Sequence, residues 1–138
     1  MDINPKTADT TAFAYMGDAV YEVYIRRYVI ESTAVKNTER NAFAIGFVKA
    51  DSQAEIIRTM LREEFLTEEE IRLVKRARNR TNTSRPRGSS PAAYKWATGF
   101  EALIGWLYLS GDETRLLEVE RRAVEIHEAV HQNTQKNA

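Results

Sequence analysis

Asp18 and Glu101 are the residues of this 138-residue chain whose type and surroundings most clearly point to chemistry. Asp18 lies in the run from Phe13 to Glu22 and Glu101 in the run from Thr98 to Gly105, and the immediate neighbours of both acids are small or apolar. A carboxylate in an apolar setting costs free energy unless it is paired, hydrogen-bonded or bound to a metal ion. Two such acids therefore suggest a shared divalent cation.

Helical periodicity assigns the two acids to separate helices. We expect the first helix to run from Thr10 or Thr11 to about Tyr28, and the helix of Glu101 to span Ala92 to Leu109. The apolar stripe predicted for the first helix consists of Phe13, Met16, Val20, Tyr24 and Arg27. The small residues beside the acids are Ala14 and Gly17 on the first helix and Ala97 and Gly105 on the second. These small residues would let the two backbones approach and bring both carboxylates to one ion.

The remaining segments predict further helices and no strand. Ser52 to Glu55 and Thr67 to Glu70 each have the form of a capping box, which marks a helix start. Residues 79–91 are rich in Asn, Thr, Ser and Pro and predict a loop, and a last helix begins near Glu113. The predicted fold class is all-α, with about six or seven helices.

Length and composition favour one domain over residues 1–138, of which about 132–138 are expected to form a disordered tail. The chain has no cysteine, which excludes disulfides and thiolate zinc sites and suits a reducing compartment. No signal peptide or membrane span is predicted. We therefore expect a cytoplasmic protein with no membrane association.

The formal net charge of zero hides a strong segregation of charge. Between residues 72 and 95 there is no acidic residue, although basic residues are frequent. The residues predicted to bind nucleic acid are Lys75, Arg76, Arg78, Arg80, Arg85, Arg87 and Lys95. Such a block can meet a polyphosphate even in a neutral protein, and a solvated helix face that runs into a loop is the alternative.

The surroundings of both acids also carry a family resemblance. Gly17 to Val20, followed by Phe100 to Leu109, resembles the two signature blocks of the ribonuclease III catalytic domain, in the same order. The similarity covers roughly Thr10 to Asp112. Because little chain follows the second block, the sequence most resembles the compact Mini-ribonuclease III group, which lacks a double-stranded-RNA-binding domain.

This resemblance implies a ribonuclease III-like helical fold and Mg2+-dependent cleavage of double-stranded RNA. Asp18 and Glu101 match the acids of the family's site, so both are expected to be metal ligands and catalytic residues. The group is associated with maturation of the large-subunit (23S) ribosomal RNA precursor, and this substrate is carried over as an expectation.

The sequence departs from the wider family at two acidic positions. Ribonuclease III signatures add an acid four residues before Asp18 and another three residues before Glu101, where this chain has Ala14 and Thr98. The expected site is therefore sparse, with water and substrate phosphate completing the coordination. Glu22 or the hydroxyl of Thr98 could assist, and the number of ions stays open.

The resemblance further implies a homodimer in which the first helix packs against its twofold mate. Large apolar side chains on this helix exceed the number that one face of a small domain needs. They are Phe13, Tyr15, Met16, Val20, Tyr21 and Tyr24. A plain core helix explains them nearly as well.

Two alternative functions remain at this point. The segment from His127 to His131 matches the His-Glu-x-x-His motif of zinc metalloproteases, but the chain has no other histidine and only polar residues follow it. A chance match is the better interpretation. The second alternative is a non-catalytic RNA-binding or dimerisation module, against which the presence of both Asp18 and Glu101 argues.

Overall fold

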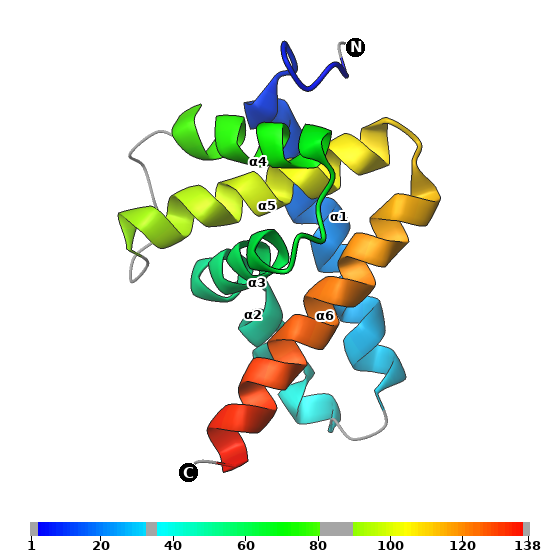
Figure 1. Cartoon of the computed structure of the whole chain (residues 1–138). Helices are drawn as coiled ribbons and strands as arrows, with labels where there is room; N and C mark the ends of the chain where they lie inside the picture. Colours follow the sequence, from blue (N-terminus) through cyan, green and yellow to red (C-terminus); the bar gives the residue numbers. More distant parts are fainter. Residues whose placement is uncertain (1–2, 33–35, 81–89, 137–138) are drawn as a thin grey trace.

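The protein is built from α-helices. A computed structural model describes residues 3–32, 36–80 and 90–136, with side chains as far as residue 131. The helices are α1 (Thr10–Glu31), α2 (Arg40–Val48), α3 (Ala50–Arg62), α4 (Glu68–Arg80), α5 (Pro91–Leu109) and α6 (Glu113–Lys136), and a short 3-10 turn, η1 (Asn37–Glu39), precedes α2 (Figure 1). No strand occurs within these ranges, which confirms the predicted all-α class.

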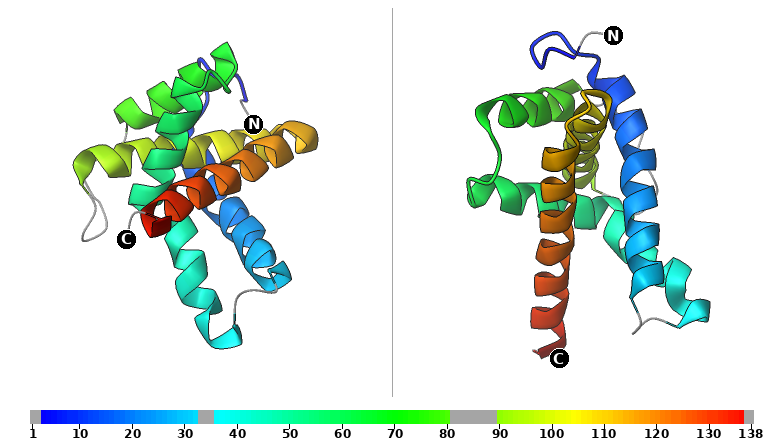
Figure 2. Two further views of the ribbon diagram at one scale, coloured as in Figure 1. Left: turned by 60° about the horizontal axis from the view of Figure 1, so that its bottom comes forward. Right: turned by 90° about the vertical axis from the view of Figure 1, so that its right-hand side faces the viewer.

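Helix α5 lies at the centre of the fold. Helices α1, α3 and α4 all pack against it, and the right-hand view of Figure 2 shows α1 and α4 on opposite sides of α5. Its buried positions are Ala97, Gly99, Phe100, Ala102, Leu103, Ile104, Gly105 and Leu107. A helix that is apolar on nearly all sides must be surrounded by other elements, and α5 meets this condition. Glu101 is therefore carried by the most enclosed helix of the described chain.

The starts of α4 and α5 follow from their capping residues. The Thr67 amide donates to Glu70 Oε1 at 2.9 Å, and the Glu70 amide donates to Thr67 Oγ1 at 3.2 Å, which confirms the predicted capping box. At α5, Ser90 Oγ accepts from the Ala93 amide at 3.0 Å, and Pro91 occupies the first helical position. Local sequence thus determines where both helices begin.

The second predicted capping box is wrong. Helix α3 begins at Ala50, so Ser52 and Glu55 lie inside the helix rather than before it. The cause is Lys49, whose extended backbone separates α2 from α3. The Ser52 hydroxyl donates instead to the Gly46 carbonyl of α2 at 2.5 Å.

The predicted apolar stripe of α1 is displaced by about one residue. The side chains of Met16, Val20 and Tyr24 are only partly buried and Arg27 is exposed. The buried positions of α1 are instead Thr10, Phe13, Gly17, Tyr21, Ile25 and Val29. The stripe passes through Gly17, a residue without a side chain, and for this reason a hydrophobic pattern does not reveal it.

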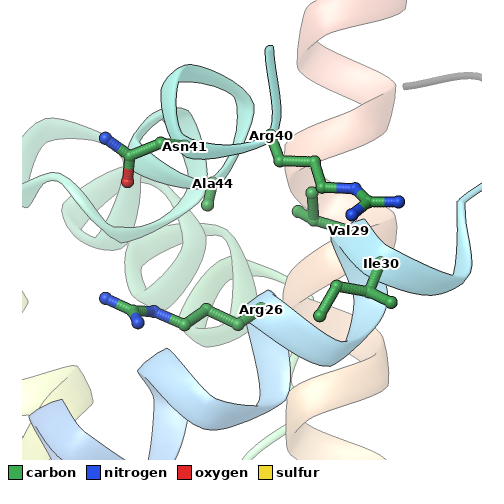
Figure 3. Close-up of a pocket in the computed structure, with 6 residues that line it drawn as sticks. All are labelled: Arg26, Val29, Ile30, Arg40, Asn41 and Ala44. Atoms are coloured by element: carbon green, nitrogen blue, oxygen red, sulfur yellow. The ribbon is translucent and has the colours of Figure 1, made fainter. Parts of the chain in front are cut away.

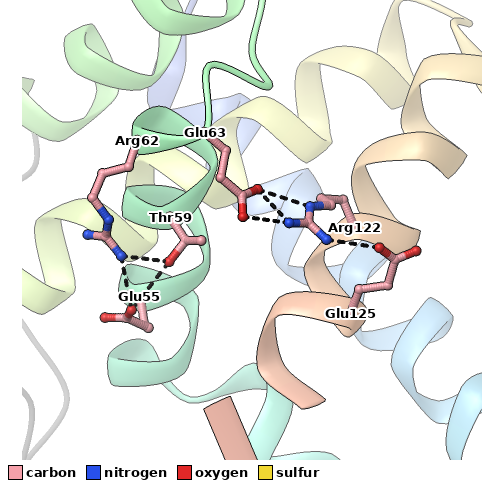
Figure 4. Close-up of polar contacts among 6 residues, drawn as sticks. All are labelled: Glu55, Thr59, Arg62, Glu63, Arg122 and Glu125. Carbon is pink, nitrogen blue, oxygen red and sulfur yellow. Dashed lines mark hydrogen bonds and ion pairs between the residues drawn. The ribbon is translucent and has the colours of Figure 1, made fainter. Parts of the chain in front are cut away.

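Helix α6 is joined to the C-terminal end of α3 by the ion pair between Arg122 and Glu63 (Figure 4). Arg122 donates to both carboxylate oxygens of Glu63 at 2.5 to 3.1 Å and to Glu125 at 2.9 Å. Partly exposed pairs of this kind add about 1 kcal/mol or less each, so they fix the register of α6 more than they stabilise it. The backbone of α6 is helical as far as Lys136. The disordered tail was predicted to begin at about residue 132.

Candidate metal centre

The site is created by an unusually close crossing of α1 and α5. A Cβ atom on Gly17 would overlap the carbonyl oxygen of Glu101, and a Cβ atom on Gly105 would overlap the carbonyl oxygen of Phe13. The two backbones therefore touch where the glycines face each other. The predicted approach through small residues is present, and Gly17 and Gly105 are the residues that make it.

This crossing places Asp18 and Glu101 side by side. Asp18 is exposed and Glu101 is partly buried, so the apolar setting that the sequence predicts for both acids is present for Glu101 and wrong for Asp18. Burial raises the pKa of Glu101 to about 9, together with a hydrogen bond and charge repulsion from Asp18, whereas a hydrogen bond from Gln53 lowers it. The charged form of Glu101 is therefore disfavoured beside Asp18, and a bound cation would supply a compensating charge.

The donor atoms fit Mg2+. Carboxylate oxygens are hard ligands, and Mg2+ commonly binds to one or two carboxylates while it keeps several water molecules. Within the part of the chain that the structure describes, no group of three or more His, Asp or Glu residues is placed to hold a metal ion. Asp18 and Glu101 would therefore hold the ion as a pair, with water and phosphate oxygens as the remaining ligands.

The two expected helpers are engaged elsewhere. Glu22 Oε1 accepts from Arg26 Nε at 2.9 Å, one turn further along α1. The Thr98 hydroxyl donates to the Tyr94 carbonyl at 2.9 Å, within α5. Their assistance at the acid pair stays a prediction.

Gln53 is a member of the site that sequence reasoning missed. Its side chain comes from α3, is 2% exposed and makes a hydrogen bond to Glu101. A glutamine in a mixed helical run reads as a surface residue, because glutamine is mostly exposed. Only the packing of α3 against α5 identifies it.

The predicted nucleic-acid-binding residues fall into distinct groups. Those with exposed side chains are Lys75, Arg80 and Lys95. Arg76 is partly buried and donates to the Pro5 carbonyl at 2.8 Å, so it fastens the N-terminal segment to α4. Arg78 lies over the Trp96 ring at 4.5 Å and joins α4 to α5. Arg85 and Arg87 lie outside the described residues.

The His-Glu-x-x-His match is part of the packing between helices. The His127 ring lies 4.3 Å from Phe47 and 4.7 Å from His131, measured between ring centroids. Burial lowers the pKa of His127 to about 4, with smaller contributions from His131 and Lys49. No third zinc ligand joins the two histidines within the described ranges. The histidines therefore provide no support for a metalloprotease.

A pocket of about 240 Å³ lies away from the acids, between the end of α1 and the start of α2 (Figure 3). Its floor includes Val29, Ile30 and Ala44. Arg26 and Arg40 also line it, but Figure 3 shows their guanidinium groups pointing to opposite sides. They do not converge on one anion.

One side of α1 exposes large apolar residues. Tyr15 is 83% exposed, Val23 69% and Ile30 60%, and these residues follow one another at about two helical turns. Of the residues predicted for a dimer contact, Phe13 and Tyr21 are instead fully buried in the core. The exposed apolar surface of α1 is thus different from the face that packs on α5.

Comparison with known proteins connects this geometry to a family. The family described as Ribonuclease III domain matches residues 11–112, a range that contains both acids. The Mini-ribonuclease 3 of Clostridium tetani is 38% identical over 96% of this chain and 87% of its own length. Those of Symbiobacterium thermophilum and of a Thermoanaerobacter species are 38% and 40% identical, over 91% and 83% of this chain and 95% and 80% of their own lengths.

The fold has a solved counterpart. A crystal structure of a protein from Fusobacterium nucleatum superposes with a TM-score of 0.74 at 28% sequence identity. The match covers 86% of this chain and 93% of the other.

Proposed function

Because this chain belongs to the ribonuclease III family and, within it, to the Mini-ribonuclease 3 group, we propose that Asp18 and Glu101 are the catalytic residues of a double-stranded-RNA endonuclease and that they hold Mg2+. The endoribonuclease activity on double-stranded RNA follows from the family itself. The assignment of residues and metal is supported by one observation above all, the contact of the two carboxylates at the glycine crossing of α1 and α5.

The two acids have different roles in this proposal. Asp18 is exposed and can meet a substrate in solution, whereas Glu101 is partly buried in the central helix α5. Bound Mg2+ would activate the attacking water and stabilise the leaving oxygen of the phosphodiester. Asp18 and Glu101 would hold the ion, and water and a substrate phosphate would supply its remaining oxygen ligands.

The exposed cations of α4 and α5 are proposed to hold the RNA. Lys75 and Arg80 belong to α4 and Lys95 belongs to the first turns of α5, so they lie on the two helices that are packed together. Duplex RNA is recognised mainly through phosphates and 2′-hydroxyl groups, which flexible cations suit. Arg85 and Arg87 lie outside the described residues, and we propose from the sequence alone that they also bind RNA.

The natural substrate and the assembly are further parts of the proposal. We assign the large-subunit (23S) ribosomal RNA precursor as the substrate, in the cytoplasm, on the resemblance to the compact group.

The exposed apolar side of α1 is assigned to a homodimer contact, because large apolar patches rimmed by polar residues mark interaction sites. None of the helices within the described ranges is long and apolar enough to span a membrane.

The test is incubation with long duplex RNA, single-stranded RNA and duplex DNA, each with and without Mg2+. We expect cleavage of duplex RNA alone, and only when Mg2+ is present. A non-catalytic RNA-binding module of the same fold would instead bind duplex RNA without cleaving it. Cleavage in the presence of a chelator would contradict the metal assignment.

A further inference from the structure

The side-chain amide of Gln53 has a hydrogen-bond partner for its nitrogen but none, among the described residues, for its oxygen. Its Nε2 donates to the Val48 carbonyl at 2.9 Å, at the end of α2. A carbonyl oxygen can only accept, so this bond places the amide nitrogen on the Val48 side and fixes the orientation of the group. The side-chain oxygen Oε1 must then point elsewhere.

Gln53 Oε1 is buried and has no hydrogen-bond partner among the described residues. A buried amide oxygen in this state is unfavourable, and such oxygens are normally matched by protein groups or ordered water. Gln53 also comes close enough to Glu101 for a hydrogen bond from it to lower the pKa of that carboxyl. The unsatisfied acceptor thus belongs to a side chain that borders the acid pair.

We propose that Gln53 is a positioning residue of the metal centre, which orients the Glu101 carboxylate through its amide nitrogen and accepts a hydrogen bond through Oε1 from water in the hydration shell of the cation. This inference rests on the proposed binding of Mg2+ by Asp18 and Glu101. It also accounts for the neutral side chain. A third carboxylate here would add to the repulsion between the two acids, whereas an amide oxygen accepts from water without adding charge.

The role complements the sparse donor set. Mg2+ gives up its water ligands reluctantly, so a site with two carboxylates must hold several water molecules in place. Partners that orient such ligands typically change metal affinity by about 10–100-fold when they are replaced. Gln53 is the described side chain that combines contact with Glu101 and a free buried acceptor.

A purely structural role makes a different prediction. In that case Gln53 would serve only to hold the end of α2 through the Val48 carbonyl. Its replacement would lower stability and leave metal binding unchanged. Ser52 provides the matched control, because it is the neighbouring buried residue and its hydroxyl also donates to a carbonyl of α2, that of Gly46.

The experiment measures Mn2+ binding to the RNA-free protein by electron paramagnetic resonance, with melting temperatures recorded with and without Mg2+. In Gln53→Met, which keeps the length but removes the amide, the Kd for Mn2+ should rise about 10–100-fold and the Mg2+-induced rise in melting temperature should shrink. Gln53→Asn keeps the amide but shortens its reach, and it should show the same loss. Ser52→Ala should melt earlier and bind Mn2+ like the unaltered protein.

Activity gives an independent reading. In Gln53→Met the Mg2+ concentration for half-maximal cleavage should rise, while KM for RNA at saturating Mg2+ should not. Unaltered Mn2+ affinity in a folded Gln53 variant, or an equal loss in Ser52→Ala, would overturn the role of Gln53. Asp18→Asn separates the two proposals: if it also binds Mn2+ normally, the metal site itself is misassigned.

Discussion

The proposed binding of Mg2+ by Asp18 and Glu101 depends on the charge of the two side chains rather than on their volume. Substitutions that remove the charge and keep the size are therefore informative. Asp18→Asn and Glu101→Gln each remove a ligand charge with almost no change in size. We expect each to reduce cleavage of duplex RNA by at least about 100-fold in Mg2+, with duplex binding and melting temperature nearly retained. Single-turnover cleavage, filter binding and thermal melting measure these effects. Near-normal turnover by either variant would show that the substituted residue is not catalytic.

Glu120 and His127 show that buried ionisable groups also occur outside the site. Burial raises the pKa of Glu120 to about 7, so the folded state binds a proton more readily than the unfolded state does. The resulting stability is present below the ordinary pKa of 4.5 and is lost as the pH rises through about 7. His127 acts in the opposite direction: its stability is present above 6.5 and is lost as the pH falls toward about 4.

These opposite slopes lead to a prediction. Glu120→Gln should raise the free energy of unfolding at pH 8, by roughly 1–3 kcal/mol, and change it little at pH 4.5. His127→Leu should do the reverse, with its benefit confined to acidic pH. Urea unfolding at the two pH values measures both. His127→Leu should also retain nuclease activity within a few fold, and loss of activity together with bound zinc would revive the metalloprotease alternative.

At the level of single residues, the sequence predicted the acids but not their partner. Asp18 and Glu101 stand out because each interrupts an apolar run, and such runs can be read without a structure. Gln53 could not be found in this way, because its role arises from contacts with Val48 and Glu101 on other helices. Side-chain partners across helices depend on packing, which one sequence does not record.

At the level of elements, the crossing of α1 and α5 controls the site. Gly17→Ala or Gly105→Ala would place a Cβ atom on a backbone oxygen of the opposite helix, which neither helix can move away from cheaply. Each variant should lose several kcal/mol of stability or fail to fold, since overpacking of a core contact alone costs about 1–3 kcal/mol. Chemical denaturation measures the loss.

Gly46→Ala is the matched control for the glycine variants. Gly46 also lies inside a helix, but a Cβ atom there would meet only His127 Nε2, at 3.9 Å. Replacement of a helical glycine by alanine gains up to about 1 kcal/mol where space allows. A stable Gly17→Ala variant with full activity would show that the helices can separate at this point, contrary to the described crossing.

The prediction of elements succeeded where the cause was local. The capping box at Thr67 and Glu70 is formed by residues three apart, and the structure contains both of its hydrogen bonds. The start of α3 was misplaced because an extended Lys49, rather than the Ser52 motif, ends the preceding helix. The stripe of α1 was misplaced because Gly17 packs through its backbone. Both errors concern positions whose conformation is decided by neighbouring helices.

At the scale of the whole molecule, the exposed apolar side of α1 predicts self-association. Tyr15→Asp changes a residue that is 83% exposed, so the folded monomer should keep its melting behaviour. If α1 forms the dimer contact, this charge should convert a dimer into a monomer at micromolar concentration, as measured by analytical ultracentrifugation. Leu117→Asp, on the partly exposed surface of α6, should leave the mass unchanged. A dimer that survives Tyr15→Asp must use another surface.

The distribution of charge leads to the final prediction, which concerns RNA binding. The chain has 20 basic and 20 acidic residues, so a salt-sensitive attraction to RNA must come from a local cluster rather than from net charge. Lys75, Arg80 and Lys95 are exposed on the adjoining helices α4 and α5. Each that touches a phosphate releases counterions on binding, and each alanine substitution should then reduce the log–log salt slope by up to roughly one unit.

The measurement is the affinity for duplex RNA of the triple alanine variant between low and moderate salt, made with Asp18→Asn in the background so that no cleavage occurs. Arg121→Ala is the control, since Arg121 is an exposed cation on α6 and should leave the slope unchanged. Cleavage is measured on the triple variant without Asp18→Asn. At saturating RNA its cleavage rate should fall less than its affinity does, because Asp18 and Glu101 remain in place. If affinity and slope both stay at their original values, the duplex must follow a different surface of the protein.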